Sequence, residues 1–223
     1  MLEEHKTIAK DIIDLAQGYG AEQVSVSLAK STSFQVDVRE QKIDSLQESG
    51  SSGIHLTVSK NKRRSTVSSN DFRAETLAPL IRSTMEALPY MGADEYYSLP
   101  NPELQGRAPG ELEFLDPDYD KLSSEDKVQI TLDLEEMSLD ADQRLKTEQS
   151  FYSDSISYMV HADSNGFLEG ETKTIYSMGI SMIADDLEST SNGTSESTNV
   201  GRKQTDGWYS AARFHRNLTP SKE

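Results

Sequence analysis

The length, composition and charge of this 223-residue chain exclude several classes of function before any motif is considered. Thirty-eight acidic against 22 basic residues give a net charge of −16, which repels a phosphate backbone and argues against direct binding of nucleic acid. Zero cysteines remove disulfides, thiol nucleophiles and thiolate metal sites together. Without a membrane-length apolar run or a signal-peptide pattern, we expect a soluble, cytoplasmic protein.

The N-terminal part of the chain predicts one helix followed by a meander of strands. Apolar residues at helical spacing predict the helix, which Gly18 and Gly20 are placed to end. Alternation of apolar and polar residues then predicts four short strands, with a basic turn at Asn61 inside the last of them. These strands fall within residues 21–30, 33–40, 42–49 and 53–69.

A second helix is predicted within residues 72–88, with Asn70 or Asp71 as its cap. Pro79 leaves two alternatives: the helix begins late, so that Pro79 lies in its first turn, or it bends at Pro79. The Pro-rich segment that follows has the composition of a loop. We therefore predict two regions, 1–110 and 111–223.

The second region predicts an acidic third helix and then long hairpins. Ser123 and Asp126 have the spacing of a capping box, and we interpret the acidic residues that follow as a solvated face. Long strands are predicted at 144–163 and 167–186, around the turn Ser164–Asn165–Gly166. A further hairpin has its tip at 189–197 and ends in an alternating strand that contains Trp208 and Tyr209. The predicted fold class is α+β, with antiparallel sheets, about three packing helices and long C-terminal β-hairpins.

The last residues, "NLTPSKE", have the pattern of a helix start. Thr219 is placed as an N-cap, Pro220 at the first helical position and Glu223 in the first turn. We therefore expect the chain to be the N-terminal part of a longer protein.

The residues that could carry chemistry form no catalytic or metal-binding pattern. His5, His55, His161 and His215 lie far apart in the sequence, and we expect His5 to be solvated on its helix. Acid pairs such as Glu135–Glu136, Asp116–Asp118 and Asp185–Asp186 arise freely in so acidic a chain. The serine runs lack a partnered base, and Gly166, Gly170 and Gly179 fit a turn and close strand packing. The sequence predicts no catalytic residue and no metal ligand.

Four short motifs in a fixed order resemble the N-terminal half of the TldD/PmbA family. They are an R-x-x-x-I-x-x-L-x-x-S stretch, a G-I-x-x-x-V strand, an S-S-x-D segment before the second helix, and an N-S-x-G turn with its counterpart in "DSNGF". The residues concerned are Arg39, Ile43, Leu46, Ser49, Gly53, Ile54, Val58, Ser68, Ser69, Asp71 and the turn 163–167. The acidic central loop and the "SSND" and "ADSNGFLEG" stretches favour the PmbA branch, also called TldE.

The resemblance implies a zinc metallopeptidase assembled from two related subunits in the cytosol of bacteria and archaea. In that family the TldD subunit carries a His-Glu-x-x-x-His metal helix, which the PmbA subunit lacks. The helix would lie beyond residue 223, so the resemblance assigns no cofactor and no catalytic residue to this chain, and zinc to the assembled enzyme. The implied partners are a TldD-like paralogue and an unfolded polypeptide substrate.

We therefore interpret the chain as part of a non-catalytic subunit that contributes a substrate chamber and partner contacts. Residues 144–215 are expected to form a sheet for both purposes. The residues expected to face peptide or partner are Ser164, Asn165, Gly166, Trp208 and Tyr209. One alternative is a non-catalytic interaction protein that modulates DNA gyrase or its inhibitor. Another is a TldD-like catalytic subunit whose metal motif lies beyond residue 223.

Overall fold

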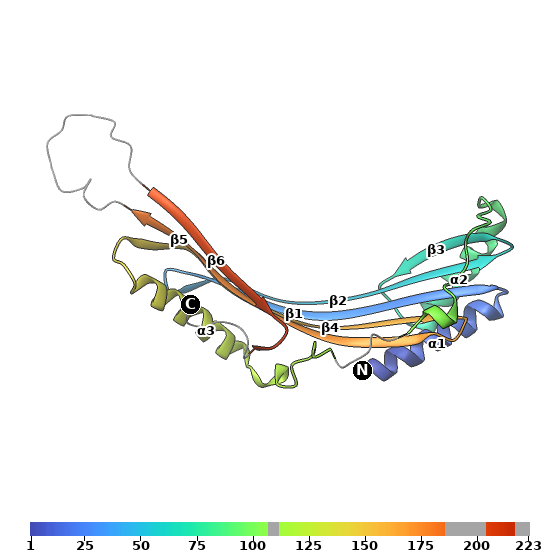
Figure 1. Ribbon diagram of the computed structural model, residues 1–223, viewed down its shortest axis with the longest axis horizontal. Helices are drawn as coiled ribbons and strands as arrows, with labels where there is room; N and C mark the ends of the chain where they lie inside the picture. Colours follow the sequence, from blue (N-terminus) through green and yellow to red (C-terminus); the bar gives the residue numbers. More distant parts are fainter. Residues whose placement is uncertain (107–111, 186–203, 217–223) are drawn as a thin grey trace, which may run out of the picture. The chain divides into compact units, whose positions relative to one another are not determined.

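The computed structural model describes residues 1–106, 112–185 and 204–216 (Figure 1). One antiparallel sheet has the strand order β3-β2-β1-β4-β5-β6, and three α-helices accompany it in the described residues. The predicted α+β class is confirmed. The helices are α1 (Leu2–Gly18), α2 (Ala74–Ala87) and α3 (Ser124–Leu139). The strands are β1 (Gln23–Arg39), β2 (Lys42–Lys60), β3 (Arg63–Ser69), β4 (Leu145–Asp163), β5 (Leu168–Asp185) and β6 (Gln204–Arg213).

The chain forms two compact units, each assembled from three segments of the sequence. The first unit comprises residues 1–32, 50–113 and 156–173. The second comprises 33–49, 114–155 and the described residues after 173. Strands β1, β2, β4 and β5 therefore each give one part to each unit.

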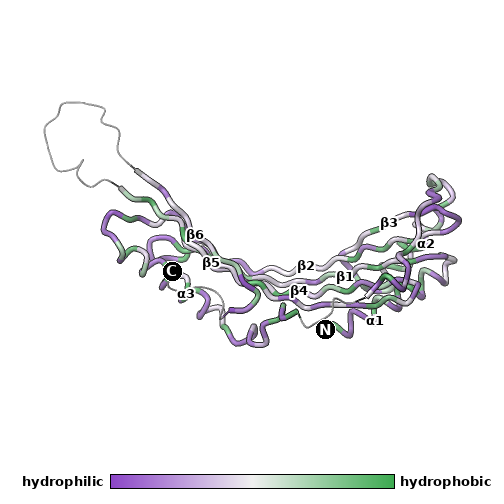
Figure 2. The backbone as a smooth tube through the Cα atoms, viewed as in Figure 1, coloured by the Kyte–Doolittle hydropathy of each residue, from purple (hydrophilic) through white to green (hydrophobic). Residues whose placement is uncertain are grey.

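The first unit is built around an aliphatic core. Helices α1 and α2 contact each other, and each turns an apolar stripe towards the strands. On α1 the buried residues Ala9, Ile12, Ile13 and Ala16 follow helical spacing, as the sequence predicted. Hydropathy alternates along the strands that they face (Figure 2).

His5 is buried within this first unit, which corrects the expectation that it is solvated. Its imidazole is 5% exposed and meets the rings of Phe72 and Tyr158 edge-on, at centroid distances of 5.9 and 6.3 Å. Burial lowers the pKa of His5 below its usual value, although the nearby carboxylate of Glu4 opposes the shift. The sequence position of His5, one helical turn before Ala9, is consistent with this inward orientation.

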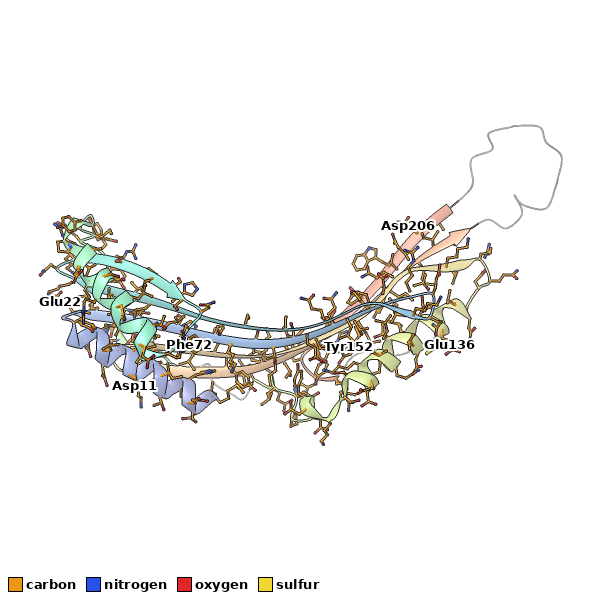
Figure 3. All side chains as sticks on the ribbon, turned by 180° about the vertical axis from the view of Figure 1, so that it is seen from behind. Asp11, Glu22, Phe72, Glu136, Tyr152 and Asp206 are labelled. Carbon is orange, nitrogen blue, oxygen red and sulfur yellow. The ribbon has the colours of Figure 1, made fainter. Side chains whose placement is uncertain are left out.

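In the second unit, α3 covers one face of the sheet (Figure 1). The core here is small, and Figure 3 shows Tyr152 on the side of α3 that faces the sheet. The capping box predicted for α3 is present, because the side chain of Ser123 accepts from the Asp126 N–H and the Asp126 carboxylate accepts from the Ser123 N–H. The core residues are Phe34, Val36, Val38, Tyr152, Tyr176 and Met178.

The N-terminal meander has fewer and longer strands than the sequence predicted. Segments 21–30 and 33–40 were expected to be separate strands, whereas β1 runs without a break from Gln23 to Arg39. Serine pairs bridge β1 to β2 through the polar stretch: Ser31 bonds Ser51 at 3.1 Å and Ser33 bonds Ser49 at 2.8 Å. Because these hydroxyls pair across the strands, the loss of apolar residues does not end the ladder.

Helix α2 begins before Pro79, so the late-start alternative is wrong. Pro79 is exposed and lies inside the helix, beyond its first turn. Asp71 acts just before the helix: its carboxylate accepts from the Arg73 N–H at 2.9 Å and from the Thr76 hydroxyl at 2.8 Å. The N-cap position itself is occupied by Arg73, which makes no side-chain capping bond.

The predicted hairpin around Ser164–Gly166 is confirmed, since β4 and β5 flank this turn. The predicted turn at Asn61 is confirmed too: Asn61 and Lys62 both have positive φ angles, as a two-residue hairpin turn requires. The predicted tip at 189–197 and the predicted helix start at 217–223 lie outside the described residues. No helix among the described residues is long and apolar enough to span a membrane.

Candidate functional site

The acidic and imidazole groups of the described residues do not fit a metal site, because no three of them cluster. His55 and His161 each bond a serine on a neighbouring strand instead, His55 to Ser68 and His161 to Ser27, both at 2.8 Å. Within the residues that the structure describes, no step of a metal-dependent reaction can be derived.

The turn Ser164–Asn165–Gly166 is tied into the first unit by its polar groups. The Ser164 hydroxyl accepts from the Val24 N–H at 3.0 Å, and the Ser164 N–H donates to the Val24 carbonyl at 2.9 Å. The carboxylate of Asp163 accepts from the Asn165 N–H at 2.8 Å, and Gly166 adopts a φ of +98° that favours glycine. Asn165 and Gly166 are exposed, so the turn presents little more than one amide side chain.

Trp208 and Tyr209 lie on β6, in the second unit, and point to opposite faces of the sheet. Ala211 is opposite the core residue Met178, so Tyr209, two residues before Ala211, lies on the α3 side. Trp208 lies on the other face, opposite Ser181, and is 77% exposed. The two predicted groups, the turn and the pair on β6, thus belong to different units.

The face of the second unit opposite α3, which we call the open face, is lined by small polar side chains. Asp37 is its centre: its carboxylate accepts from Ser45 at 2.5 Å, from Gln149 at 2.8 Å and from Gln35 at 3.2 Å. Its three donors come from β2, β4 and β1, so the network crosses three neighbouring strands. A carboxylate with three donors is held in one orientation, and it orients the three side chains that donate to it.

Aromatic side chains border this polar network on the open face. A Cβ on Gly179 would lie 2.7 Å from Cε1 of Phe151 and 2.8 Å from Cβ of Ser210, so only glycine fits beneath the Phe151 ring. Ser210 and Trp208 share this face, because alternate residues of a strand point the same way. The close packing predicted for Gly179 is therefore confirmed, and it places Phe151 on the same surface as Trp208.

The outer edge of β2 in this unit has no partner strand among the described residues. Strand β3 pairs only with residues 54–60 of β2. Residues 42–52 are all exposed, including Ile43 and Leu46 at 50% and 48%. An exposed strand edge with apolar side chains is a template for the addition of another strand.

A buried polar cluster holds α3 against the other face of the sheet, opposite the open face. The Lys127 ammonium lies 2.7 Å from the carboxylate of Asp154, which also accepts from the hydroxyls of Tyr119 at 2.8 Å and Tyr152 at 2.9 Å. The ammonium stacks 4.7 Å above the ring of Phe34. Burial and the Asp154 carboxylate raise the pKa values of both tyrosines, so both hydroxyls stay protonated as donors.

Glu135 makes a second connection from α3, and it is fully buried. Its carboxylate accepts from the backbone N–H groups of Glu40 and Gln41, at 2.9 and 2.7 Å, in the turn between β1 and β2. Both turn residues have positive φ angles. Helix α3 therefore fixes the tip of the β1–β2 hairpin. The outer edge of this hairpin is the part of β2 that has no partner strand among the described residues.

Sequence reasoning missed this role of α3. Lys127, Thr131 and Glu135 recur every four residues and form the buried stripe, whereas the acidic character of the helix was interpreted as a solvated face. The sequence did contain a usable signal, because positions 128, 130, 132 and 134 are apolar and cannot all lie on one helical stripe. A helix with this pattern cannot be divided into one apolar inner face and one polar, solvated outer face. The burial of Glu135 corrects that interpretation at one of its acidic positions; the neighbouring Glu136 is exposed.

Comparison with known proteins places both halves of the chain. Residues 24–88 match the model described as PmbA/TldA metallopeptidase domain 1, and residues 117–220 match the PmbA/TldA metallopeptidase central domain. The metalloprotease PmbA of Escherichia coli O157:H7 is 23% identical over 215 residues, which are 93% of this chain and 46% of that protein.

Solved structures share the fold. A Bacteroides thetaiotaomicron VPI-5482 protein named as a proposed modulator of DNA gyrase superposes with a TM-score of 0.81 at 22% identity, covering 98% of this chain and 47% of its own. TldE from Thermococcus kodakarensis superposes with a TM-score of 0.71 at 12% identity, covering 93% and 43%. The chain thus spans less than half the length of these relatives. With two successive domain models matched in their order, it belongs to the PmbA/TldD metallopeptidase family.

Proposed function

We propose that this chain is the N-terminal part of a PmbA/TldE-like subunit of a cytoplasmic two-subunit zinc metallopeptidase that cleaves unfolded peptides. The subunit is non-catalytic, and a TldD-like paralogue supplies the zinc site. Family membership and the shared fold with TldE support the proposal. The division into regions 1–110 and 111–223 is part of it, and both regions contribute to the contact surface.

The open face of the second unit is the observation that carries the substrate and partner roles. An extended polypeptide presents alternating backbone donors and acceptors, and the exposed side chains of Ser45, Gln35 and Gln149 around the buried Asp37 offer matching groups. Trp208 adds a large exposed aromatic surface, which is typical of interaction sites. The free edge of β2 offers strand addition beside it. Ser164, Asn165 and Gly166 make a smaller, amide-bearing contact in the first unit.

The test is hydrolysis of an unstructured fluorogenic peptide by the full-length protein, alone and mixed with its TldD-like paralogue, with bound zinc measured in each sample. The proposal predicts zinc in the paralogue and activity that requires both proteins. Activity and zinc in the protein alone would favour the alternative of a TldD-like catalytic subunit.

Deletion of residues 189–197, the predicted hairpin tip, tests the proposed chamber-lining role in the assembled enzyme. We expect this variant to fold and to show altered partner binding or cleavage. Unchanged cleavage by the assembled enzyme would contradict a chamber-lining role for this hairpin.

A second candidate function rests on the name of the Bacteroides relative, a proposed modulator of DNA gyrase. In that case the chain acts as a non-catalytic interaction protein on gyrase or its inhibitor. Its net charge of −16 favours a basic protein surface over DNA as the contact. A supercoiling assay decides: a change in gyrase activity without any peptidase activity in the mixture would favour this function.

A further inference from the structure

A pocket of about 820 Å³ lies in the first unit, where the end of α1, the β2–β3 turn and the C-terminal part of α2 meet. Its volume is within the range of small-molecule sites. The lining carries three cations, Lys60, Arg63 and Arg82, against one carboxylate, that of Glu86. In a chain with a net charge of −16, this is a local reversal of sign. The rest of the lining includes apolar surface from Met85, Leu88 and Pro89.

Both arginines of the pocket are held in place by the protein itself. The Arg63 guanidinium donates to the carbonyls of Pro89 and Met91 and so fixes the chain that follows α2. The Arg82 guanidinium lies 5.4 Å from the centroid of the Tyr19 ring and donates to the Tyr19 hydroxyl at 3.3 Å. A guanidinium held this way keeps further N–H donors in a planar arrangement that suits carboxylate and phosphate oxygens.

Lys60 contributes an ammonium group, which has room in the pocket because residue 20 is a glycine. A Cβ on Gly20 would lie 3.1 Å from Lys60 Nζ, and Gly20 adopts a φ of +90°. Among the described residues Lys60 makes no ion pair, and the Glu22 carboxylate accepts from the backbone N–H of Asn61 at 3.0 Å. The pocket therefore holds one ammonium without a carboxylate partner beside two positioned guanidinium groups.

We propose that this pocket binds a small organic anion, in which a carboxylate or phosphate group is joined to an apolar body. The anionic group lies against Lys60 and Arg82, and the apolar body lies against Met85 and Leu88. Cationic side chains alone would suit any anion, but the apolar lining favours a ligand that also removes hydrophobic surface from water. This site is independent of the peptidase function proposed above, because none of its lining residues is assigned a peptide or partner contact there.

Calorimetric titration of the full chain at about 0.1 M salt tests the proposal with four probes, at an ionic strength that screens weak surface attraction. They are phenyl phosphate, hippurate, the neutral amide of hippurate, and inorganic phosphate. We expect saturable binding of phenyl phosphate, hippurate or both, and the one that binds identifies the anionic group. The neutral amide is expected not to bind, and inorganic phosphate is expected to bind at least about tenfold more weakly than phenyl phosphate.

Substitutions locate the site. Lys60→Gln and Arg82→Gln should each weaken binding roughly tenfold, the loss expected for one charge-assisted contact. The matched control is Lys62→Gln, in the same turn but outside the lining, which should keep the affinity within about twofold. All three side chains are exposed, and circular dichroism confirms the fold of each variant. Absence of binding by both organic anions, equal binding of the neutral amide, or full affinity in Lys60→Gln and Arg82→Gln would overturn the proposal.

Discussion

The two units pack helices on the same sheet with different chemistry. In the first, sixteen buried residues of the described part, all of them aliphatic, join α1 and α2 to the strands. In the second, six buried apolar residues are supplemented by an ion pair, tyrosine hydroxyls and a buried carboxylate on α3. Aliphatic burial is strong but non-directional, whereas a hydrogen-bonded cluster fixes one orientation. The unit with the open face is thus the one whose helix is positioned by directional contacts.

The largest change in stability is expected when the buried carboxylate of Asp154, in the second unit, loses its charge. Asp154→Asn leaves the Lys127 ammonium buried without a counter-charge, and we expect the free energy of unfolding to fall by about 3–5 kcal/mol. Urea denaturation measures this. The double variant Asp154→Asn/Lys127→Met should recover more than half of the loss, because a methionine suits the aromatic surroundings. A loss below about 1 kcal/mol in the single variant would mean that the second unit is also held by apolar burial.

The matching experiment in the first unit removes aliphatic volume. Ile81 on α2 is fully buried, and Ile81→Ala should lower the free energy of unfolding by about 2–4 kcal/mol through lost burial and a cavity. Ile81→Leu keeps the volume and should cost less than about 1.5 kcal/mol. If the two variants are equally unstable, the first unit depends on specific shape and the contrast between the units weakens.

A smaller effect is expected from the carboxylate that holds the β1–β2 turn. Glu135→Gln removes the charge from two backbone hydrogen bonds, and we expect a loss of about 2 kcal/mol in the free energy of unfolding. Glu136→Gln is the control, because Glu136 is exposed on the same helix (Figure 3) and should change stability by less than about 0.5 kcal/mol. Equal effects at the two positions would contradict the role of α3 as a turn clamp.

The smallest effect concerns pH and the first unit. Burial lowers the pKa of folded His5 below its value of 6.5 in the unfolded chain, so the unfolded state binds the proton first as pH falls. Stability that is present above pH 6.5 is therefore lost below it, at no more than about 1.4 kcal/mol per pH unit. Urea denaturation at pH 7.5 and 5.5 should show a smaller drop for His5→Gln than for the unchanged protein. An identical drop would assign the pH dependence to other groups.

The sequence predicted correctly those helices and turns that are determined by residues close together in the chain. The spacing of Ile12 and Ala16 gave α1, the capping box of Ser123 and Asp126 gave the start of α3, and Asn61 and Gly166 gave turns. The continuity of β1 was not predictable in this way, because it depends on serine hydroxyls of β2 that lie far away in the sequence. Strand propensity describes the single segment, not its partner.

The candidate site was predicted only in part. An exposed Trp208 on an alternating strand was recognisable, whereas the Asp37 network joins residues from three strands and has no sequence spacing of its own. The same holds for the cationic pocket, whose lining comes from Tyr19, Lys60, Arg82 and Leu88. The acidity of α3 was interpreted as a solvated face, yet Glu135 is buried because its carboxylate accepts from two backbone N–H groups that lie far away in the sequence.

The most direct test of the proposed role of the open face uses Trp208, the only tryptophan of the chain. The protein is labelled with 5-fluorotryptophan, its fluorine spectrum is recorded with and without the TldD-like paralogue and an unfolded peptide, and Trp208→Phe assigns the signal. We predict that the Trp208 signal shifts and becomes protected from solvent when paralogue or peptide is added. An unchanged Trp208 signal in a sample where the complex has formed and peptide is being cleaved would contradict the assignment of the open face as the contact surface.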